Sequence, residues 1–497
     1  MKFDIIVIGS GLGGLECGAM LSKEGFNVCV LEKHSVIGGC LQSFHRRGQI
    51  LDTGIHYVGS LDEGGILRQY FKYFGIWDKL KMKRLDENGF DVIYSGGKEY
   101  KYPMGYSSFK EQMAEYFPDS KTEISNYIDK VQEVNRLIGV EQLKMGKISQ
   151  GGLDYFSVSA DQTINSLVSN KELRNVLAGN ISLFAGDRSV STFYHHAMIH
   201  GSNIEGAYRF IDGSQQLADA LVDVIRQNGG KVISSSEVTK IAVDEGRITH
   251  VEVNNGEEEY FADTFISNLH PLSTYKLIEK NKLTKKAYIT RLSALKNSYG
   301  LFTAYLLMKP DSFPYFNYNL YLHDIEDAWY TTAYPNDTKV RFILMSSLAA
   351  SRNPKYSDVI TLLSPMYFNE VSQWAGSVCM KRGEEYELFK AKKVAEMIEM
   401  TERFSPGLSS NIQFTYSASP LTYLDYTGAP EGSAYGLIKD YKNPLLTLFP
   451  PRTKYENLLL TGQNLNVHGA VGVTLTATLT CAEILGEEYL AKKIGNL

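Results

Sequence analysis

The sequence lacks several features that mark common classes of protein. It has no run of 18 or more consecutive apolar residues, so we expect no membrane-spanning helix. An apolar strand is expected from Phe3 onward, which leaves no room for a secretory signal peptide. The net charge is −5 and basic tracts are absent, which argues against nucleic acid or an acidic membrane surface as a partner.

Cysteine is also scarce. The chain has five cysteines, an odd number without C-x-x-C spacing: Cys17, Cys29, Cys40, Cys379 and Cys481. Such a set argues against a disulfide framework or a zinc site and favours a reducing compartment. We therefore predict a cytoplasmic protein.

The composition that is present is that of a globular protein. The 497 residues are 43% hydrophobic and 22% charged, enough for two or three domains with cores of their own. The 32 tyrosines and 23 phenylalanines are a mild excess. Core filling explains this excess, and an apolar cavity with polar-tipped walls is the alternative.

The N-terminus carries the most informative motif. The apolar run Phe3–Ile8 predicts a buried strand, Gly9–Gly14 reads G-x-G-x-x-G, and a helix-like stretch follows from Leu15. A second apolar run, 28–31, ends at Glu32. Strand, glycine turn, helix, strand and acid in this order predict a dinucleotide-binding unit.

Each residue of this unit has a physical reason. Gly9 permits the tight turn out of the strand, Gly11 lets a pyrophosphate approach the backbone, and Gly14 lets helix and strand pack closely. The free N–H groups at the start of the helix favour phosphate. Glu32 is placed to accept hydrogen bonds from a ribose hydroxyl and would repel a 2′-phosphate, which argues against NADP in this slot.

The next segment departs from an NAD-only domain. Such a domain would continue with another α/β crossover, whereas the doublet Gly38-Gly39 follows the acid here. Adjacent glycines let the backbone lie flat against a ligand. No second G-x-G-x-x-G follows a strand, so a separate NADPH domain is not expected.

Hydrophobic periodicity organises the rest of the chain. Residues 66–200 predict mainly helices, and 286–445 predict strands with interleaved aromatic residues. Helices are expected at 215–227, 384–404 and from about 469 to 486, and strands at 231–233, 238–243, 247–254, 258–261, 265–268, 301–308, 340–344, 359–363 and 457–462. Nucleotide-binding elements thus fall in three separated blocks. We predict a nucleotide-binding domain from 1–80, 205–285 and 450–497, and a substrate or cap domain from 81–204 and 286–449.

Taken together, the motifs resemble a known family nearly end to end. They are D-I-I-V-I-G-S-G-L-G-G-L at Asp4–Leu15, Glu32, Gly38-Gly39, D-T-G-I-H-Y-V-G at Asp52–Gly59, the strand at Val238, S-N-L-H-P at Ser267–Pro271 and the closing glycine motif at Gly462–Gly472. The chain is similar to the flavin family of phytoene desaturases, carotenoid isomerases, retinol saturases and amine oxidases. G-G-C at Gly38–Cys40 and T-G-Q at Thr461–Gln463 resemble the retinol saturase branch most, including bacterial all-trans-retinol 13,14-reductase-like proteins.

The resemblance implies an α/β fold and FAD. The fold would be a discontinuous Rossmann-like domain with a parallel sheet, joined to a second α+β substrate domain. The residues implied in FAD binding are Gly9, Ser10, Gly11, Gly13, Gly14, Glu32, Lys33, Gly38, Gly39, Val238, Gly462, Gln463, Gly472 and Val473. Among them, Val238 would bond adenine through its backbone, and the N–H groups of Gly472 and Val473 would open the last helix toward the flavin. Many flavoproteins have an acid where this chain has Gln463.

The resemblance also implies an activity. The expected function is FAD-dependent reduction of a carbon–carbon double bond in an apolar conjugated isoprenoid, and a desaturase or a cis–trans isomerase is the alternative. A non-catalytic prenyl- or lipid-binding protein is the alternative from another class. The electron donor stays open between NAD(P)H, a quinone and another protein. An apolar substrate dissolves in lipid, so a peripheral contact with the inner membrane face is a further alternative.

Saturation needs a proton donor as well as a hydride. The candidates are His56, Tyr57 and Tyr435, although His56 also fits a packed loop histidine and Tyr435 a cavity wall. His196 and His200 have the i, i+4 spacing of metal ligands, but no further ligand or H-E-x-x-H pattern accompanies them. We therefore expect no metal. Cys40 is expected near the flavin as an inert thiol.

Overall fold

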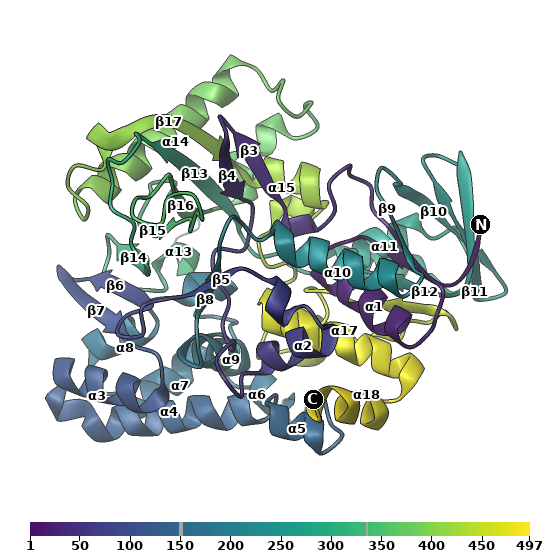
Figure 1. Ribbon diagram of the computed structural model, residues 1–497, viewed down its shortest axis with the longest axis horizontal. Helices are drawn as coiled ribbons and strands as arrows, with labels where there is room; N and C mark the ends of the chain where they lie inside the picture. Colours follow the sequence, from purple (N-terminus) through teal and green to yellow (C-terminus); the bar gives the residue numbers. More distant parts are fainter. Residues whose placement is uncertain (149–152, 334–335) are drawn as a thin grey trace.

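The computed structural model describes residues 1–148, 153–333 and 336–497. Within these residues, two sheets of seven strands each stand at opposite ends of the molecule (Figure 1). Helices fill the space between the sheets and cover their faces, and the C-terminal helices lie near the centre.

The first sheet is built from three segments that lie far apart in the sequence. Its order is β10-β11-β12-β1-β2-β9, with β18 paired to the end of β12. The strands are β1 (Lys2–Ile8), β2 (Val28–Leu31), β9 (Lys231–Ile233), β10 (Val238–Asp244), β11 (Arg247–Val253), β12 (Glu258–Ser267) and β18 (Leu458–Leu460). The pairs around β1 are parallel, and β10–β11–β12 is an antiparallel meander. These strands fall within the three predicted nucleotide-binding blocks, and the domain boundaries themselves stay predictions.

Both faces of this sheet are covered. Alternate side chains of β1 enter different cores, with Ile5 and Val7 on one side and Ile6 and Ile8 on the other. This explains why the strand reads as a continuous apolar run. On the first side pack α1 (Leu12–Lys23), α10 (Gln215–Gln227) and α17 (Gly469–Leu485), and small residues on α1 allow the close contact.

The second sheet is mostly antiparallel. Its order is β17-β13-β16-β15-β14-β6-β7, and β14–β6 is the parallel pair in it. The strands are β6 (Asp91–Ser95), β7 (Lys98–Tyr102), β13 (Gly300–Met308), β14 (Asn319–His323), β15 (Phe342–Ser347), β16 (Val359–Met366) and β17 (Ile412–Ala418). One face packs against α14 (Glu384–Glu402) through side chains such as Leu306 and Leu362. The other face looks toward the centre of the molecule with Tyr321, Leu344 and Leu363.

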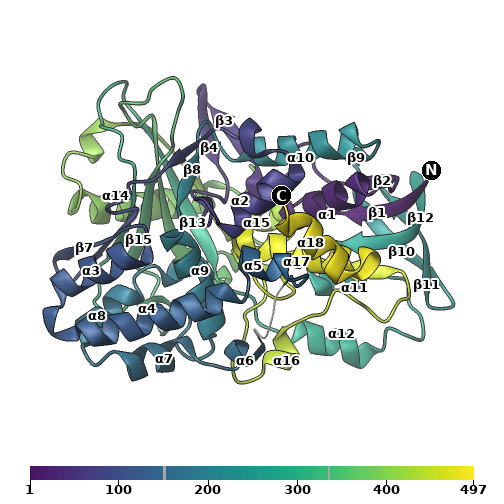
Figure 2. The same cartoon turned by 60° about the horizontal axis from the view of Figure 1, so that its bottom comes forward.

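A helical layer lies beside the second sheet. Figure 2 shows α3, α4, α7 and α8 gathered there, away from the first sheet. The layer consists of α3 (Tyr106–Tyr116), α4 (Lys121–Arg136), α6 (Leu153–Phe156), α7 (Ala160–Leu167), α8 (Lys171–Leu177) and α9 (Phe193–Ile204), whereas α5 (Val140–Lys144) packs against α18 (Glu487–Gly495). The predicted helical region is confirmed at α2 (Ile66–Phe74) and, among the described residues, from 106 onward. It is wrong at β5 (Met82–Arg84), β6 and β7, where the Gly96-Gly97 turn, with φ of 59° and 79°, folds 91–102 into a hairpin.

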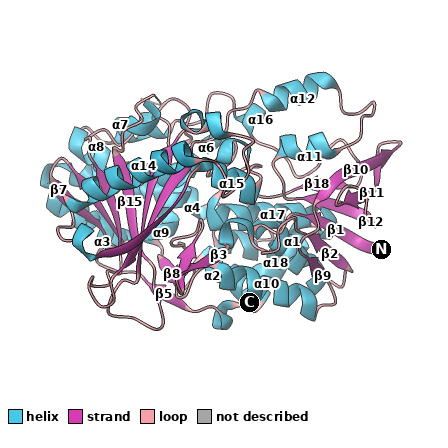
Figure 3. Ribbon diagram, turned by 90° about the horizontal axis from the view of Figure 1, so that it is seen from above, coloured by secondary structure: helices cyan, strands magenta, loops and turns pink. Residues whose placement is uncertain are grey.

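The remaining elements connect these parts. They are β3 (Ser43–Arg46), β4 (Gln49–Asp52), α2 (Ile66–Phe74), β8 (Tyr208–Phe210), α11 (Pro271–Leu277), α12 (Lys286–Ser293), α13 (Tyr330–Ala333), α15 (Pro420–Thr427), α16 (Pro444–Thr447) and α18 (Glu487–Gly495). The strands expected at 258–261 and 265–268 are one strand, β12, because it pairs with β1 along 261–267. In Figure 3, α15 and α17 lie between the two sheets. No helix in the described part of the chain is long and apolar enough to cross a membrane.

Candidate functional site

The first glycine turn has the geometry that the sequence predicts. Gly9 follows β1 with φ of 95°, and α1 begins at Leu12. A methyl group on Gly14 would lie 2.1 Å from the carbonyl oxygen of Gly9, so only glycine fits where the helix meets the strand. The N–H of Gly9 donates to Leu31 O at 2.8 Å, which fixes the turn to β2.

Glu32 is held tightly by the chain itself. Its carboxylate accepts the N–H of Ser10 at 3.0 Å, the hydroxyl of Ser10 at 2.6 Å and the N–H of His34 at 2.9 Å. The side chain is buried, at 7% exposure. A carboxylate offers about four acceptor positions, so about one remains for a ligand hydroxyl. The Glu32 carboxylate therefore keeps about one acceptor position for the predicted hydrogen bond from a ribose hydroxyl.

The glycine doublet lies against the first turn. Gly38 and Gly39 have φ of 122° and 58°, and the N–H of Gly38 donates to the hydroxyl of Ser10 at 3.1 Å. A methyl group on Gly39 would lie 3.2 Å from Cα of Gly11. Lys33 points elsewhere, because its ammonium donates to Asp425 O of α15 at 3.3 Å.

The middle nucleotide-binding block, residues 205–285, reaches the edge of the first sheet where Glu32 follows β2. Val238 begins β10 opposite Val253 and is buried, and the N–H of Ser236, two residues earlier, donates to Glu32 O at 2.7 Å. The backbone at Val238 is thus next to the acid that ends β2. An adenosine group bound by Glu32 would therefore lie next to the backbone of Val238.

The C-terminal block closes the site. Gly462 follows β18 with φ of 92°, and Gln463 comes next on a half-buried turn. The last long helix begins at Gly469, so its first free N–H groups belong to Gly469, Ala470 and Val471. Gly472 and Val473 lie one turn further on, where the N–H groups are bonded within the helix. A methyl group on Gly472 would lie 2.8 Å from Cβ of Val467.

Asn268, which the sequence analysis did not single out, stands between the two glycine turns. Methyl groups on Gly11, Gly13 and Gly462 would lie 2.8, 3.0 and 2.4 Å from its side-chain amide. Its backbone N–H donates to Ile8 O at 2.9 Å. Its place in the S-N-L-H-P motif was the available signal. The lack of side chains at these glycines lets the Asn268 amide pack between the two turns, and it leaves their backbone open to a pyrophosphate on the other side, as a dinucleotide site requires.

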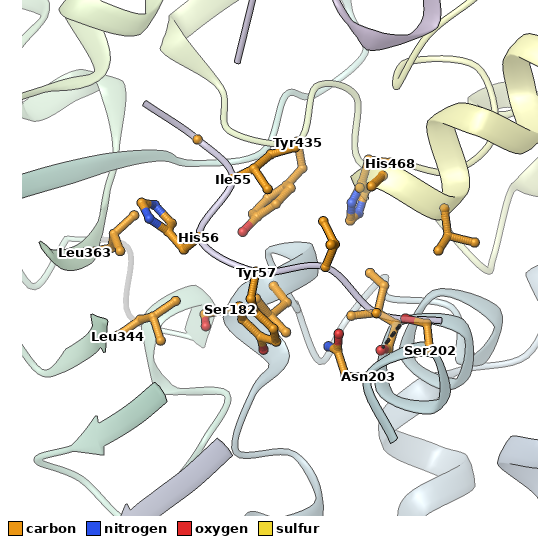
Figure 4. A pocket seen from close by; sticks show the side chains of 18 of the residues that line it. Ile55, His56, Tyr57, Ser182, Ser202, Asn203, Leu344, Leu363, Tyr435 and His468 are labelled. Atoms are coloured by element: carbon orange, nitrogen blue, oxygen red, sulfur yellow. Dashed lines mark hydrogen bonds between the residues drawn. The ribbon is translucent and has the colours of Figure 1, made fainter. Parts of the chain in front are cut away.

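A cavity begins at the N-terminal end of α17 and runs to the inner face of the second sheet (Figure 4). Most of its wall is apolar. It is lined by Gly54, Ile55, His56, Tyr57, Val58, Gly59, Ser182, Leu183, Met198, Ile199, Ser202, Asn203, Leu301, Phe342, Leu344, Leu363, Tyr435, His468, Gly469, Ala470 and Val471. The three predicted catalytic candidates, His56, Tyr57 and Tyr435, therefore meet in one cavity.

His56 is neutral in this setting. Burial and the charge of Arg209 lower the pKa of His56 to about 4. Its Nε2 has no hydrogen-bond partner among the residues that the structure describes, and the same holds for Oγ of Ser182 in the same wall. A neutral imidazole at pH 7 is a poor proton donor, although it can exchange hydrogen bonds with a ligand.

Tyr57 and Tyr435 differ in their partners. The hydroxyl of Tyr57 donates to Asp91 Oδ2 at 2.9 Å and is 2.5 Å from the hydroxyl of Tyr321. The ring of Tyr435 packs on His468 with centroids 4.7 Å apart, and burial raises the pKa of Tyr435. Figure 4 shows the Tyr435 ring pointing from the opposite wall toward the loop that carries Tyr57.

The remaining candidates for reactivity or metal binding are Cys40, His196 and His200. Burial raises the pKa of the Cys40 thiol to about 11, so it is protonated, as expected. His196 and His200 stack with centroids 5.5 Å apart, and His196 bonds the hydroxyl of Tyr127. In the described ranges, no group of three or more His, Cys, Asp or Glu side chains has an arrangement that would hold a metal ion.

Comparison with known proteins identifies the class. The model of the family described as flavin containing amine oxidoreductase matches residues 12–358. The chain belongs to this family and is therefore a flavin-dependent oxidoreductase, for which the family implies FAD.

Individual relatives cover the whole chain. All-trans-retinol 13,14-reductase of Homo sapiens is 27% identical over 540 residues, covering 100% of this chain and 87% of its own length. Prolycopene isomerase of Arabidopsis thaliana is 23% identical, covering 99% and 84%. The crystal structure of an oxidoreductase from Methanosarcina mazei matches with a TM-score of 0.63 at 18% identity, covering 96% and 99%, which supports the fold alone.

Proposed function

We propose that this protein uses FAD to reduce a carbon–carbon double bond of an apolar conjugated isoprenoid, a retinoid or a carotenoid. The observation that carries the proposal is the largely apolar cavity that begins at the helix following the C-terminal glycine turn. An extended polyene has few polar groups, so its binding rests on buried area, at about 25 cal/mol per Å². Relatives named as a retinol reductase and as a prolycopene isomerase support the substrate class.

The residues proposed to hold FAD are those of the three glycine turns. Gly9, Ser10, Gly11, Gly13 and Gly14 face the pyrophosphate, with Gly38 and Gly39 beside them. Glu32 binds the adenosine ribose and the Val238 backbone the adenine. Gly462, Gln463, Gly472 and Val473 belong to the flavin end, with free N–H groups at Gly469–Val471. Lys33 we propose to act indirectly, by tying this loop to α15.

Bound flavin would supply a hydride, which carries the electron pair. The chain must then orient the polyene, exclude water and provide a proton. Leu344, Leu363 and Phe342 form the apolar wall on the second sheet. Tyr57 is the proposed proton donor, since its hydroxyl bonds a buried acid. Tyr435 is proposed as a wall that orients the substrate, and His56 as a neutral hydrogen-bonding group.

A cis–trans isomerase is the second candidate. The observation in its favour is the prolycopene isomerase that aligns with 99% of this chain. Isomerisation leaves the hydrogen content of the polyene unchanged, whereas reduction adds two hydrogens. The mass of the product therefore separates the two candidates.

The experiment starts from purified protein supplied with FAD. Absorbance of bound flavin at about 450 nm is expected, and its absence would favour a non-catalytic lipid-binding protein. The flavin is then photoreduced without oxygen and challenged with all-trans-retinol or a carotene. Reoxidation by a polyene with a gain of two hydrogens supports the proposal, and reoxidation by none of the polyenes contradicts it.

Two finer points are proposals of their own. NAD(P)H is the proposed external reductant, and it should bleach the flavin without oxygen while a quinol should not. A cytoplasmic location with peripheral lipid contact stays a prediction. Leu445 and Leu446 of α16, 85% and 49% exposed, are the side chains to replace in a vesicle co-sedimentation test.

A further inference from the structure

A buried carboxyl group stands behind the cavity wall. Asp91 begins β6, has no exposed surface and is paired in register with Asn319 of β14. The hydroxyl of Tyr57 donates to its Oδ2 at 2.9 Å and the amide of Asn319 to its Oδ1 at 3.0 Å. Asn180 approaches Oδ2 at 3.5 Å. The sequence held a signal for this group, a carboxylate directly before the apolar pair Val92-Ile93.

This carboxyl has no directly bonded cation. Across the described residues, no lysine or arginine forms an ion pair with Asp91. The guanidinium of Arg209 instead donates to Asn319 Oδ1 at 2.8 Å, one amide further away. Burial of a carboxylate without a paired cation favours its protonated form. Burial accordingly raises the pKa of Asp91 to about 7, although its hydrogen bonds and Arg209 oppose the shift.

Tyr57 connects this acid to the cavity. Its side chain lines the cavity, and its hydroxyl bonds both Asp91 and Tyr321. Burial raises the pKa of Tyr57 well above 10, so this phenol alone is a weak acid. A neighbouring carboxyl group removes that difficulty. It gives a proton to the phenol oxygen while the phenol gives up its own proton, so no free phenolate forms.

We propose that Asp91 holds the proton consumed in polyene reduction and delivers it through the hydroxyl of Tyr57. The inference rests on the proposed function. Reduced flavin, when bound, would supply one hydride, which carries the electron pair, to one carbon of the double bond. The O–H bond of Tyr57 breaks as a C–H bond forms at the other carbon. When Asp91 is protonated, its own O–H donates across the 2.9 Å contact, and its proton moves to the Tyr57 oxygen. The buried carboxylate then regains a proton from solvent through the hydroxyl of Tyr57, whose side chain lines the cavity, after the product has left.

The other titratable groups near Asp91 do not change their protonation state around neutral pH. Arg209 comes from β8, Tyr321 from β14 and Tyr102 from β7, and burial raises the pKa of both tyrosines above their ordinary range. His56, across Arg209, titrates near 4. Asp91 is therefore the positioning residue whose protonation would set a pH profile near 7.

The experiment measures reoxidation of the photoreduced, FAD-loaded protein by all-trans-retinol between pH 5 and 9. The wild-type rate is expected to fall as pH rises, with a midpoint near 7. Asp91→Asn and Tyr57→Phe should each lower the rate at pH 6 at least about tenfold, and Asp91→Asn should be flat from pH 6 to 8. Asp91→Glu should restore part of the pH dependence.

A second readout needs no turnover. The infrared C=O stretch of a carboxylic acid should titrate near pH 7 in the FAD-loaded wild type and in Tyr57→Phe, and be missing in Asp91→Asn. The chain offers a control, because Glu205 is a partly buried acid that also accepts a tyrosine hydroxyl, that of Tyr106 at 2.7 Å. Glu205 and Tyr106 do not line the cavity, so Glu205→Gln and Tyr106→Phe should keep the wild-type pH profile.

The outcomes separate the two proposals. A wild type that turns over retinol while Asp91→Asn does so equally fast at every pH overturns the role of Asp91. A carboxyl that is ionised from pH 5 upward overturns it as well. A wild type that no polyene reoxidises defeats the proposed function, and the proton path with it. Loss of the pH profile in Glu205→Gln to the same extent would assign the effect to general packing and overturn the inference.

Discussion

Ser10 and Glu32 are joined twice: the N–H and the hydroxyl of Ser10 both donate to Oε2 of Glu32, at 3.0 and 2.6 Å. The same hydroxyl accepts the N–H of Gly38 at 3.1 Å. One serine thus links the first glycine turn, the acid at the end of β2 and the glycine doublet. These three parts of the cofactor site are therefore expected to respond together to mutation.

Replacing Glu32 tests the adenosine end of the site. Glu32→Ala should weaken FAD retention by about 1–3 kcal/mol, roughly fivefold to 150-fold in Kd, because a charge-assisted hydrogen bond to ribose is lost. Flavin fluorescence in a titration of the FAD-free protein measures this Kd. Glu245→Ala, on an exposed turn, is the control. An unchanged Kd in Glu32→Ala would refute the ribose contact.

Gly14→Ala tests the contact between helix and strand. The added methyl group would lie 2.1 Å from Gly9 O, so α1 must move away from β1. We expect a loss of at least about 2 kcal/mol in the free energy of unfolding, together with weaker FAD binding. Gly139→Ala is the matched control, because its methyl group would lie 3.6 Å from the nearest atom, Asn135 O. Denaturant unfolding checks both variants, and equal stability of the two would contradict the argument.

Buried histidines should make the protein unstable in acid. Burial lowers the pKa to about 4 for His56, His196, His270 and His323 and to about 3 for His468. Each folded-state pKa is below the unfolded value of about 6.5, so the unfolded chain binds more protons. The stability that these residues contribute is therefore complete above pH 6.5 and is lost as pH falls toward 4.

His323 gives a clean test of that slope. It donates to Gly179 O at 2.8 Å, and glutamine can keep a donor without titrating. His323→Gln should reduce the dependence of unfolding free energy on pH between 6 and 4.5 by about 1 kcal/mol per pH unit. His45→Gln, at an exposed position, should not. Urea denaturation at several pH values measures the slope, and equal slopes in His323→Gln and the wild type would refute the assignment.

Replacing two neighbouring leucines on β16 tests substrate binding and packing separately. Leu363 lines the cavity, whereas Leu362 points to the opposite face and packs toward α14. Leu363→Ala should raise KM for the polyene about tenfold, because about 1–2 kcal/mol of apolar contact with substrate is lost. Leu362→Ala should lower stability and leave KM unchanged. A KM that rises equally in both would show that the cavity wall is not a substrate contact.

The nucleotide-binding part was the most predictable from sequence. Its strands are short apolar runs bounded by glycine, and its turns require residues that adopt positive φ or lack a side chain, as at Gly9 and Gly14. Such requirements are local, so one sequence displays them. The joined strand β12 was missed because β1 imposes its length through pairing, a contact between residues far apart in the chain.

The substrate cavity was the least predictable part. Its candidates His56, Tyr57 and Tyr435 could be named from motifs, but their chemistry depends on neighbours from other segments. Tyr57 owes its setting to Asp91, 34 positions away, and to Tyr321, 264 positions away. No local pattern announces such partners, because the pairing of β6 with β14 creates them.

The positions of β18 and α17 in the sequence determine when the cofactor site is completed during synthesis. The amide of Asn268 and the first glycine turn are complete well before residue 300, yet the turn at Gly462 and the helix at Gly469 come only in the last 40 residues or so. A nascent chain that ends before residue 457 therefore has half of a cofactor site and an uncovered edge on β12. Flavin capture is therefore expected only after the turn at Gly462 and α17 have been synthesised, with the apolar face of α1 exposed until α17 arrives.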